Sequence, residues 1–238
     1  MICCFIEKVL FYIKKMERTV KIKSITPVTH DVKQFTIEKP TGYDFTPGRA
    51  TEVSINKEGW REEKRPFSFT SLREAEDLEF TIKIYPDHNG VTKELDTLVP
   101  GDELIIRDNW GAIEYKGDGY VIAGGAGITP YIAMFRDLYE KDKLKGLHLF
   151  FSNKTDKDII LKEELDKMLG KNVTYVITDQ EDTNYYHGYI NKEFLKEQVD
   201  DFSTHFYVCG PPEMTRAIKE ILEECGASAD AVVLDDQV

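Results

Sequence analysis

Residues 65–71 of this 238-residue chain, Arg-Pro-Phe-Ser-Phe-Thr-Ser, combine a permanent cation, aromatic rings and hydroxyl groups in one short segment. Arginine offers a planar pair of donors to a phosphate, and an aromatic ring gives a planar heterocycle a surface for stacking. The segment has the composition of a β-strand, so Arg65, Phe67 and Phe69 are expected on one face and Ser68 and Thr70 on the other. Binding of one ligand with an anionic and an aromatic part is one interpretation. A half-buried strand with an incidental arginine is the alternative.

A glycine-rich stretch at residues 124–130 lies between a predicted buried strand and a predicted helix. Gly125 and Gly127 allow backbone amides to approach a pyrophosphate closely, next to the positive end of the helix. Thr129 is predicted to be the N-cap, and Pro130 suits the first helical position. The spacing Gly-x-Gly-x-x-Pro differs from the dinucleotide fingerprint, and no acidic residue follows at the ribose position, so a simple dehydrogenase is not supported.

Cys209, Gly210 and Pro211 form a third motif, again between a predicted strand and a helix. Ligands of a doubly wound sheet bind at the carboxyl ends of its strands, so Cys209 is expected to face the same crevice as the glycine-rich stretch. A buried thiol before a sharp turn is the alternative. Thr92 is predicted to cap a short helix whose amide end points at an anion, or to be an ordinary helix cap.

The elements that position these motifs fall into two groups. The first half contains six short runs rich in β-branched and aromatic residues and bounded by turn residues: 20–28, 32–37, 51–55, 65–70, 78–85 and 103–107. Without a long helix among them, these runs predict an N-terminal antiparallel six-stranded β-barrel.

From about Tyr120 onward, apolar runs alternate with helical patterns, which predicts a doubly wound parallel sheet. The apolar runs are 121–123, 147–151, 175–177 and 206–208, and the helical patterns are 130–139, 162–169, 191–199 and 212–225. We therefore expect a barrel domain at 17–116 and an α/β domain at 117–238, with Gly117 and Gly119 loosening the chain near the boundary.

Residues 1–16 are interpreted as a tail or a mis-assigned start, because their apolar run is too short to span a bilayer and lacks a signal-peptide cleavage pattern. The net charge of −12 argues against broad nucleic-acid binding. Cysteines at positions 3, 4, 209 and 225 have no metal-ligand spacing, so we expect no metal site and a reducing, cytoplasmic location. No stable membrane insertion is expected.

The three motifs, in this order on this two-part plan, resemble the ferredoxin–NADP reductase family of flavoproteins over roughly residues 17–225. The family pattern Arg-x-Tyr/Phe-Ser-x-x-Ser matches Arg65, Phe67, Ser68 and Ser71, with Pro66 inside it. The resemblance implies that Arg65 holds the FAD pyrophosphate, that Phe67 stacks near the flavin, and that Ser68 is a catalytic residue beside flavin N5. It also implies a cofactor wall at Ile82, Lys83 and Ile84 and a second pyrophosphate turn at Gly90, Val91 and Thr92.

In the second half, the resemblance assigns Gly125, Gly127, Thr129 and Pro130 to the nicotinamide-dinucleotide loop. It places the thiol of Cys209, followed by Gly210 and Pro211, beside the nicotinamide ring as a second catalytic group. NADPH-binding relatives often carry Ser-Arg after the third strand of this domain, where this chain has Thr178-Asp179. A carboxylate repels the 2′-phosphate, so NADH is expected, while Lys154 keeps NADPH open.

The resemblance implies an FAD-dependent NAD(P)H oxidoreductase that passes hydride from nicotinamide C4 to flavin N5 and then electrons to an acceptor. A carrier protein such as flavodoxin or ferredoxin is the expected partner. The alternatives are a stand-alone reductase of flavins, ferric chelates or quinones, and an electron-transfer subunit of a larger complex.

Overall fold

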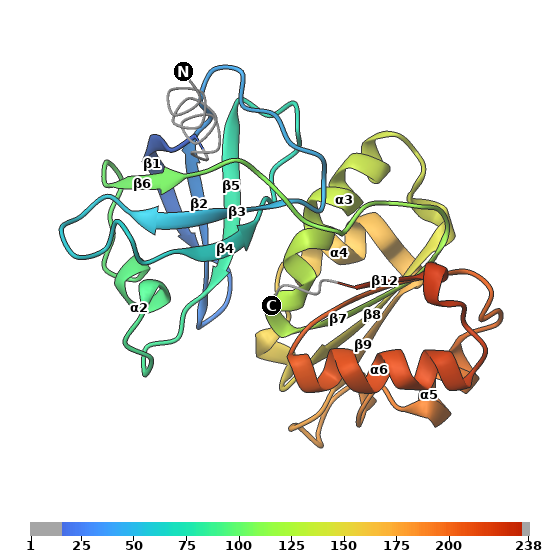
Figure 1. Cartoon of the computed structure of the whole chain (residues 1–238). Helices are drawn as coiled ribbons and strands as arrows, with labels where there is room; N and C mark the ends of the chain where they lie inside the picture. The colour runs from blue at the N-terminus through green and yellow to red at the C-terminus, as the bar shows by residue number, and fades with distance from the viewer. Residues whose placement is uncertain (1–15, 235–238) are drawn as a thin grey trace, which may run out of the picture.

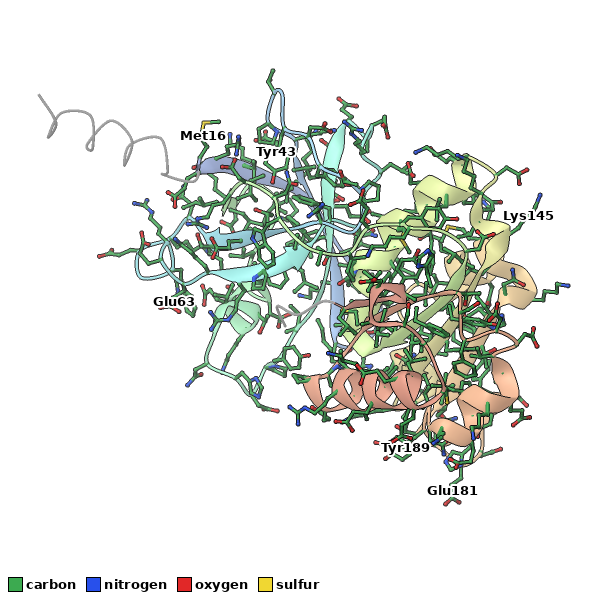
Figure 2. All side chains as sticks on the ribbon, turned by 45° about the vertical axis from the view of Figure 1, so that its right-hand side comes forward. Met16, Tyr43, Glu63, Lys145, Glu181 and Tyr189 are labelled. Atoms are coloured by element: carbon green, nitrogen blue, oxygen red, sulfur yellow. The ribbon has the colours of Figure 1, made fainter. Side chains whose placement is uncertain are left out.

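The computed structural model describes residues 16–234, which form two β-sheets that lie side by side (Figure 1). The interpretation of residues 1–16 as a tail lies almost entirely outside the described residues. Within residues 16–234, the structure contains no helix with the length and apolar character needed to cross a membrane. Figure 2 labels Met16, Tyr43 and Glu63 in the half of the molecule that contains the first sheet, and Lys145 and Glu181 in the half that contains the second sheet.

The first sheet is antiparallel and has the strand order β4-β3-β6-β1-β2-β5. Its strands are β1 (Arg18–Pro27), β2 (Val32–Glu38), β3 (Ala50–Ile55), β4 (Arg65–Ser68), β5 (Asp77–Lys83) and β6 (Glu103–Ile106). The two edge strands meet just beyond β4, where Phe69 bridges Phe80 and the Thr70 amide donates to the Glu79 carbonyl at 2.8 Å. This contact curls the sheet into the predicted six-stranded barrel, which is confirmed.

The strand that carries the first motif is shorter than predicted. The predicted run continued to residue 70, but β4 ends at Ser68 because Phe69 turns toward β5. Phe69 is fully buried between Phe45 and Phe80, at ring-centroid distances of 4.4 and 5.1 Å, whereas Arg65 is exposed. Arg65 and Phe69 were expected on the same face of one strand. They differ in burial because the strand ends before Phe69.

The short helix after the barrel's fifth strand also begins differently from the prediction. Helix α2 (Val91–Leu95) has Gly90 as its N-cap, in extended conformation, and no side chain caps it. The predicted cap, Thr92, is the second residue of the helix. The prediction of Thr92 as N-cap was therefore wrong, because the preceding glycine already supplies the extended backbone that starts the turn.

The second sheet is parallel, with the strand order β10-β9-β8-β7-β11-β12. Its strands are β7 (Gly119–Gly124), β8 (Leu147–Asn153), β9 (Val173–Ile177), β10 (Tyr186–His187), β11 (His205–Cys209) and β12 (Val232–Leu234). Its helices are α3 (Thr129–Glu140), α4 (Lys162–Leu169), α5 (Lys192–Gln198) and α6 (Pro212–Glu224). The short edge strands β10 and β12 were not predicted.

Helices cover both faces of the parallel sheet (Figure 1). Val121 and Ala123 of β7 pack into the core formed with α3 and α4, whereas Ile122 packs into the core formed with α5 and α6. Successive residues of a strand face opposite sides, so this continuous apolar run is buried on both faces. The predicted doubly wound sheet is confirmed.

Hydrogen bonds fix the connection between the two sheets near Gly117, where its glycines were expected to make the chain looser. The Tyr207 hydroxyl accepts from the amides of Lys116 and Gly117 at 2.9 and 3.0 Å and donates to the Gly117 carbonyl at 2.8 Å. A Cβ on Gly119 would lie 2.0 Å from the His205 carbonyl oxygen. Glycine at position 119 therefore allows the connection to lie against β11, and the domain boundary near it stays a prediction.

Candidate functional site

A cavity of about 790 Å³ lies between the two sheets and is lined by residues of both. This volume falls in the range typical of ligand sites. From the barrel side, β4, β5 and α2 contribute lining residues. These are Pro66, Phe67, Ser68, Thr81, Ile82, Lys83 and Thr92. The predicted first motif therefore reaches the cavity through the last three residues of β4.

Five residues predicted to bind the cofactor lie outside the cavity lining: Arg65, Ser71, Ile84, Gly90 and Val91. Arg65 is exposed beside the lining residue Pro66, and its Nη1 donates to the Lys64 carbonyl at 2.7 Å. Ser71 is buried, and its Oγ accepts from the Glu79 amide at 3.2 Å. Ile84 and Val91 belong to the barrel core. The structure thus gives Ser71, Ile84 and Val91 packing and hydrogen-bonding roles in the barrel.

The glycine-rich stretch forms the facing wall of the cavity, through Gly125, Gly127, Thr129 and Pro130. Gly125 has a φ of +51°, and a Cβ at this position would meet no atom within 4 Å. A Cβ on Gly127 would instead lie 2.3 Å from the Cys209 carbonyl oxygen. Gly125 therefore leaves open space at the cavity wall, while Gly127 allows the loop to contact the end of β11.

The start of the helix behind this loop differs from the predicted cap. A short 3₁₀ turn, η1 (Gly125–Ile128), precedes α3, whose N-cap is Ile128. Thr129 is already helical, and its hydroxyl donates back to the Ala126 carbonyl at 3.0 Å. The prediction of Thr129 as N-cap and Pro130 as first helical residue was therefore wrong by one position. The 3₁₀ turn before α3 already has helical backbone, so the helix starts one residue earlier than predicted.

The third motif lines the same cavity. Cys209 ends β11, is only 4% exposed, and pairs with Ala123 of β7 directly before the glycine-rich stretch. Cys209, Gly210 and Pro211 all contact the cavity. A Cβ on Gly124 would clash with the Met214 sulfur of α6 at 2.5 Å, so this turn and the glycine loop are packed tightly together. The glycine-rich stretch and the Cys209 motif thus form one wall of the cavity.

Several lining residues were not predicted as site residues. Trp110 lies in the connection after β6, and its main chain pairs with Ala50 through two 2.8 Å hydrogen bonds. Its indole Nε1 is buried without a hydrogen-bond partner among the described residues. Buried donors are nearly always paired, so this unpaired nitrogen in a lining residue is unusual. Ser152 and Asn153, which end β8, also line the cavity, as expected of the carboxyl end of a parallel strand.

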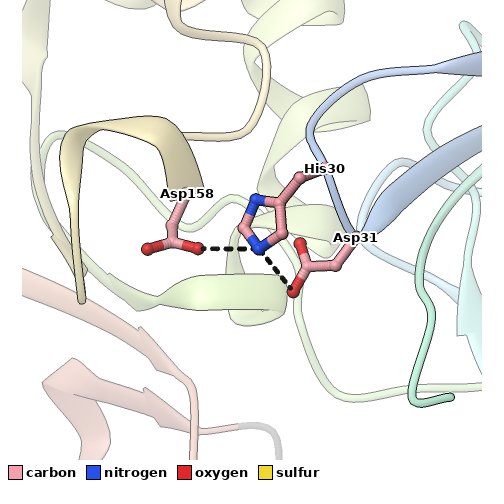
Figure 3. A group of neighbouring side chains, drawn as sticks. All are labelled: His30, Asp31 and Asp158. Atoms are coloured by element: carbon pink, nitrogen blue, oxygen red, sulfur yellow. Dashed lines mark ion pairs between the residues drawn. The ribbon is translucent and has the colours of Figure 1, made fainter.

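At the cavity lining, an ionic cluster joins the two halves of the molecule (Figure 3). His30 Nε2 lies 3.7 Å from Asp31 and 3.8 Å from Asp158 of η3 (Asp156–Asp158). Burial opposes the charge of Asp31, but the Lys83 ammonium at 2.7 Å and the Thr29 hydroxyl outweigh it and lower the pKa of the Asp31 carboxyl.

The same cluster has the ligand types of a cation site. However, the Lys83 ammonium already neutralises Asp31, and the Asp158 carboxylate accepts from the Thr155 amide and hydroxyl at 2.8 and 2.7 Å. A metal ion would compete with these contacts and be repelled by the ammonium. We therefore assign the cluster to a polar contact between the barrel and the α/β half, which is ionic when His30 is protonated.

Comparison with known proteins agrees with this geometry. Residues 121–220 match the oxidoreductase NAD-binding domain family. NADH-cytochrome b5 reductase 1 of Aspergillus clavatus is 30% identical, over 91% of this chain and 78% of that protein. The reductase component of propane 2-monooxygenase from Rhodococcus jostii is 27% identical, over 90% of this chain and 62% of that protein.

Solved structures show the same fold. A ferredoxin NADP+ reductase from Neisseria gonorrhoeae, solved with bound FAD and NADP, superposes with a TM-score of 0.81 at 19% identity. The match covers 92% of this chain and 98% of that one. The similarity to the cytochrome b5 reductase shows that the chain belongs to the ferredoxin–NADP reductase-like family of oxidoreductases, and the two-sheet architecture and the cavity between the sheets agree with this.

Proposed function

We propose that the chain is an FAD-dependent oxidoreductase that is reduced by NADH and that holds both molecules in the cavity between its sheets. The observation that carries this proposal is that all three motifs, represented by Ser68, Gly127 and Cys209, line one cavity. When bound, FAD and NADH supply the redox chemistry, which is hydride transfer from nicotinamide C4 to flavin N5 followed by release of electrons to an acceptor. The protein supplies binding, orientation and exclusion of water.

The barrel wall fits a flavin. Phe67 is half-buried, with its ring centroid 6.4 Å from that of Phe80, so it offers a supported aromatic surface. Ser68 supplies a hydroxyl at the same wall, and the Trp110 indole supplies a buried donor that lacks a partner among residues 16–234. The exposed guanidinium of Arg65 lies beside Pro66, where a pyrophosphate at the edge of the cavity can reach it.

The opposite wall fits a nicotinamide dinucleotide. The open backbone at Gly125 and the amide end of the η1–α3 segment suit a pyrophosphate. Cys209 and Gly210 lie at the carboxyl end of β11, next to that of β7, where ligands of such sheets bind. Ser68 and Cys209, from opposite walls, are the groups we propose to contact the reacting rings.

The preference for NADH rests on Asp179. Its amide donates to the Lys154 carbonyl at 2.8 Å, so the ends of β8 and β9 are joined, and Lys154 and Thr178 line the cavity. The Asp179 side chain is exposed next to them and accepts from the Thr178 hydroxyl at 2.7 Å. A 2′-phosphate in this region would meet a carboxylate, which favours NADH, although Lys154 offers NADPH a compensating charge.

The acceptor we propose is a one-electron carrier protein or an oxygenase component. The curated relatives include a cytochrome b5 reductase and the reductase component of a monooxygenase. Flavodoxin and ferredoxin are carriers of this kind, whereas free flavin, ferric chelates and quinones are the alternatives. Turnover with a carrier that falls steeply with ionic strength would favour a protein acceptor.

An anaerobic titration tests the nicotinamide proposal. The purified protein, loaded with FAD, is mixed separately with NADH and NADPH while its visible flavin absorbance is followed. We expect rapid bleaching by NADH and slow bleaching by NADPH. Faster bleaching by NADPH would contradict the role of Asp179, and a protein that takes up no FAD would contradict the proposed function as a whole.

A further inference from the structure

Arg136 of α3 makes a set of contacts that the sequence pattern does not predict. Its Nε and Nη2 donate to the two carboxylate oxygens of Glu164 at 2.6 and 2.9 Å, so this pair is bidentate. Its Nη1 donates to the Thr70 carbonyl and to Glu79 Oε1, both at 2.6 Å. Glu164 belongs to α4 of the α/β half, whereas Thr70 and Glu79 belong to the barrel. One guanidinium therefore ties the two halves together.

The barrel end of this contact connects to the wall that carries Ser68. Thr70 follows β4 by two residues, and its hydroxyl donates to Glu79 at 2.7 Å. The Glu79 amide in turn donates to the Ser71 hydroxyl at 3.2 Å. Arg136 thus contacts the segment immediately after Ser68, and that segment is itself fixed to β5.

The other end of the contact connects to the nucleotide loop. Arg136 lies two turns into the helix that begins at Thr129, about 10.5 Å along its axis from the glycine-rich stretch. The guanidinium side chain is only 17% exposed. Burial opposes its charge, but Glu164 and Glu79 outweigh burial and raise the pKa of Arg136 above its usual value. The Arg136 guanidinium therefore stays charged across the working range of pH.

We propose that Arg136 is a positioning residue that fixes the distance between the Ser68 wall and the glycine-loop wall of the cavity, and so sets the rate of transfer between the bound rings. This inference rests on the proposed function. It differs from the His30 contact, in which the nearest atoms are 3.7 and 3.8 Å apart and the histidine side chain is 62% exposed. The rigid guanidinium of Arg136 fixes the relative position of the groups that it bonds. Solvent and salt weaken an exposed contact such as that of His30.

The experiment compares Arg136→Gln with Arg136→Lys and with a matched control, Arg73→Gln. Arg73 makes a bidentate pair with Asp44 that stays within the barrel and away from the cavity. Each FAD-loaded protein is mixed anaerobically with NADH, and the limiting rate of flavin bleaching is separated from the Kd for NADH. Amide hydrogen exchange is measured over residues 65–84 and 125–140 in the same proteins.

For Arg136→Gln we expect the limiting rate to fall by about tenfold to a hundredfold, the loss expected of a misplacement near 1 Å. The Kd should change less than about threefold, because no contact to NADH is removed. Exchange should accelerate in both segments. Arg136→Lys, which keeps the charge but loses the fork, should recover the rate only in part, and Arg73→Gln should match the wild type.

A limiting rate for Arg136→Gln within about twofold of the Arg73→Gln control would overturn the positioning role while leaving the proposed function intact. A wild-type protein that NADH does not bleach would refute the proposed function itself. If Arg136→Gln does not fold, Glu79→Gln and Glu164→Gln separate the two ends of the contact. Only Glu79→Gln should slow flavin bleaching, because Glu79 is the partner in the barrel, whereas Glu164 lies in the same half as Arg136. Equal bleaching rates for the two variants would refute the inference.

Discussion

Replacing Gly127 by alanine tests whether the nucleotide loop must contact the end of β11. A Cβ at this position would lie 2.3 Å from the Cys209 carbonyl oxygen, 2.6 Å from its carbonyl carbon and 2.7 Å from the Gly210 Cα. All three atoms belong to the backbone, so no side-chain rotation relieves the clash. Ordinary van der Waals contact begins at 3.4 Å, so the loop must move away by about 1 Å.

The expected cost follows from this displacement. Overpacking of a tight site costs about 1–3 kcal/mol, which for a chain of this size lowers Tm by about 2–12 °C. Because the loop and the Cys209 turn form one wall of the cavity, the same movement should slow flavin bleaching by NADH by about a hundredfold. Thermal unfolding and anaerobic stopped-flow mixing measure the two effects.

Gly125→Ala is the matched comparison two residues away. Its Cβ meets nothing within 4 Å, but its φ of +51° is unfavourable for alanine, so we expect a strain cost of about 1–2 kcal/mol without displacement of the loop. The reasoning is refuted if Gly127→Ala keeps the wild-type Tm and bleaching rate, or if Gly125→Ala is the more damaging of the two.

Three further predictions address charge. Burial lowers the pKa of His148, so as the pH falls the unfolded chain binds this proton before the folded chain does. The free energy of unfolding therefore decreases as the pH falls below about 6.5. Urea denaturation at several pH values should show a weaker pH dependence of this free energy for His148→Gln, and an unchanged pH dependence would contradict the prediction. With the imidazole protonated, His30→Gln should lower stability by less than about 1 kcal/mol, and the difference should vanish in high salt, which Tm at two ionic strengths and acidic pH checks. Asp179→Ser should raise kcat/KM for NADPH relative to NADH by up to about fivefold, and no change would show that this carboxylate does not face the 2′-phosphate.

The two-part architecture was predictable because each half has a distinct local pattern. Short β-branched runs with turn residues predicted the barrel, and apolar runs such as residues 147–151 alternating with helical patterns predicted the parallel sheet. The early end of β4 was not predictable, because it depends on Phe69 packing between Phe45 and Phe80 from elsewhere in the chain. The strands β10 and β12 are too short to give a periodic signal.

The candidate site was predictable where backbone geometry demands a residue type. Gly127 is needed for close contact with Cys209, and the sequence spacing alone pointed to it. Trp110 and His30 come from connections without periodicity, so only the folded chain brings them to the cavity. Arg136 follows an amphipathic helical pattern on which a cation is typical of a solvent face. Its partners Thr70 and Glu79 are distant in sequence, which is why the pattern gave no sign of the contact.

If one cavity holds both ligands as proposed, nicotinamide C4 meets the flavin in a single orientation. The most direct measurement is anaerobic single-turnover bleaching of the FAD-loaded protein by NADH deuterated at C4, on one face or on the other. We expect slower bleaching with deuterium on one face and an unchanged rate with deuterium on the other, because rings bound between the walls at Ser68 and Cys209, as proposed, would be held in one register. Equal rates with both labelled forms and with unlabelled NADH would contradict it.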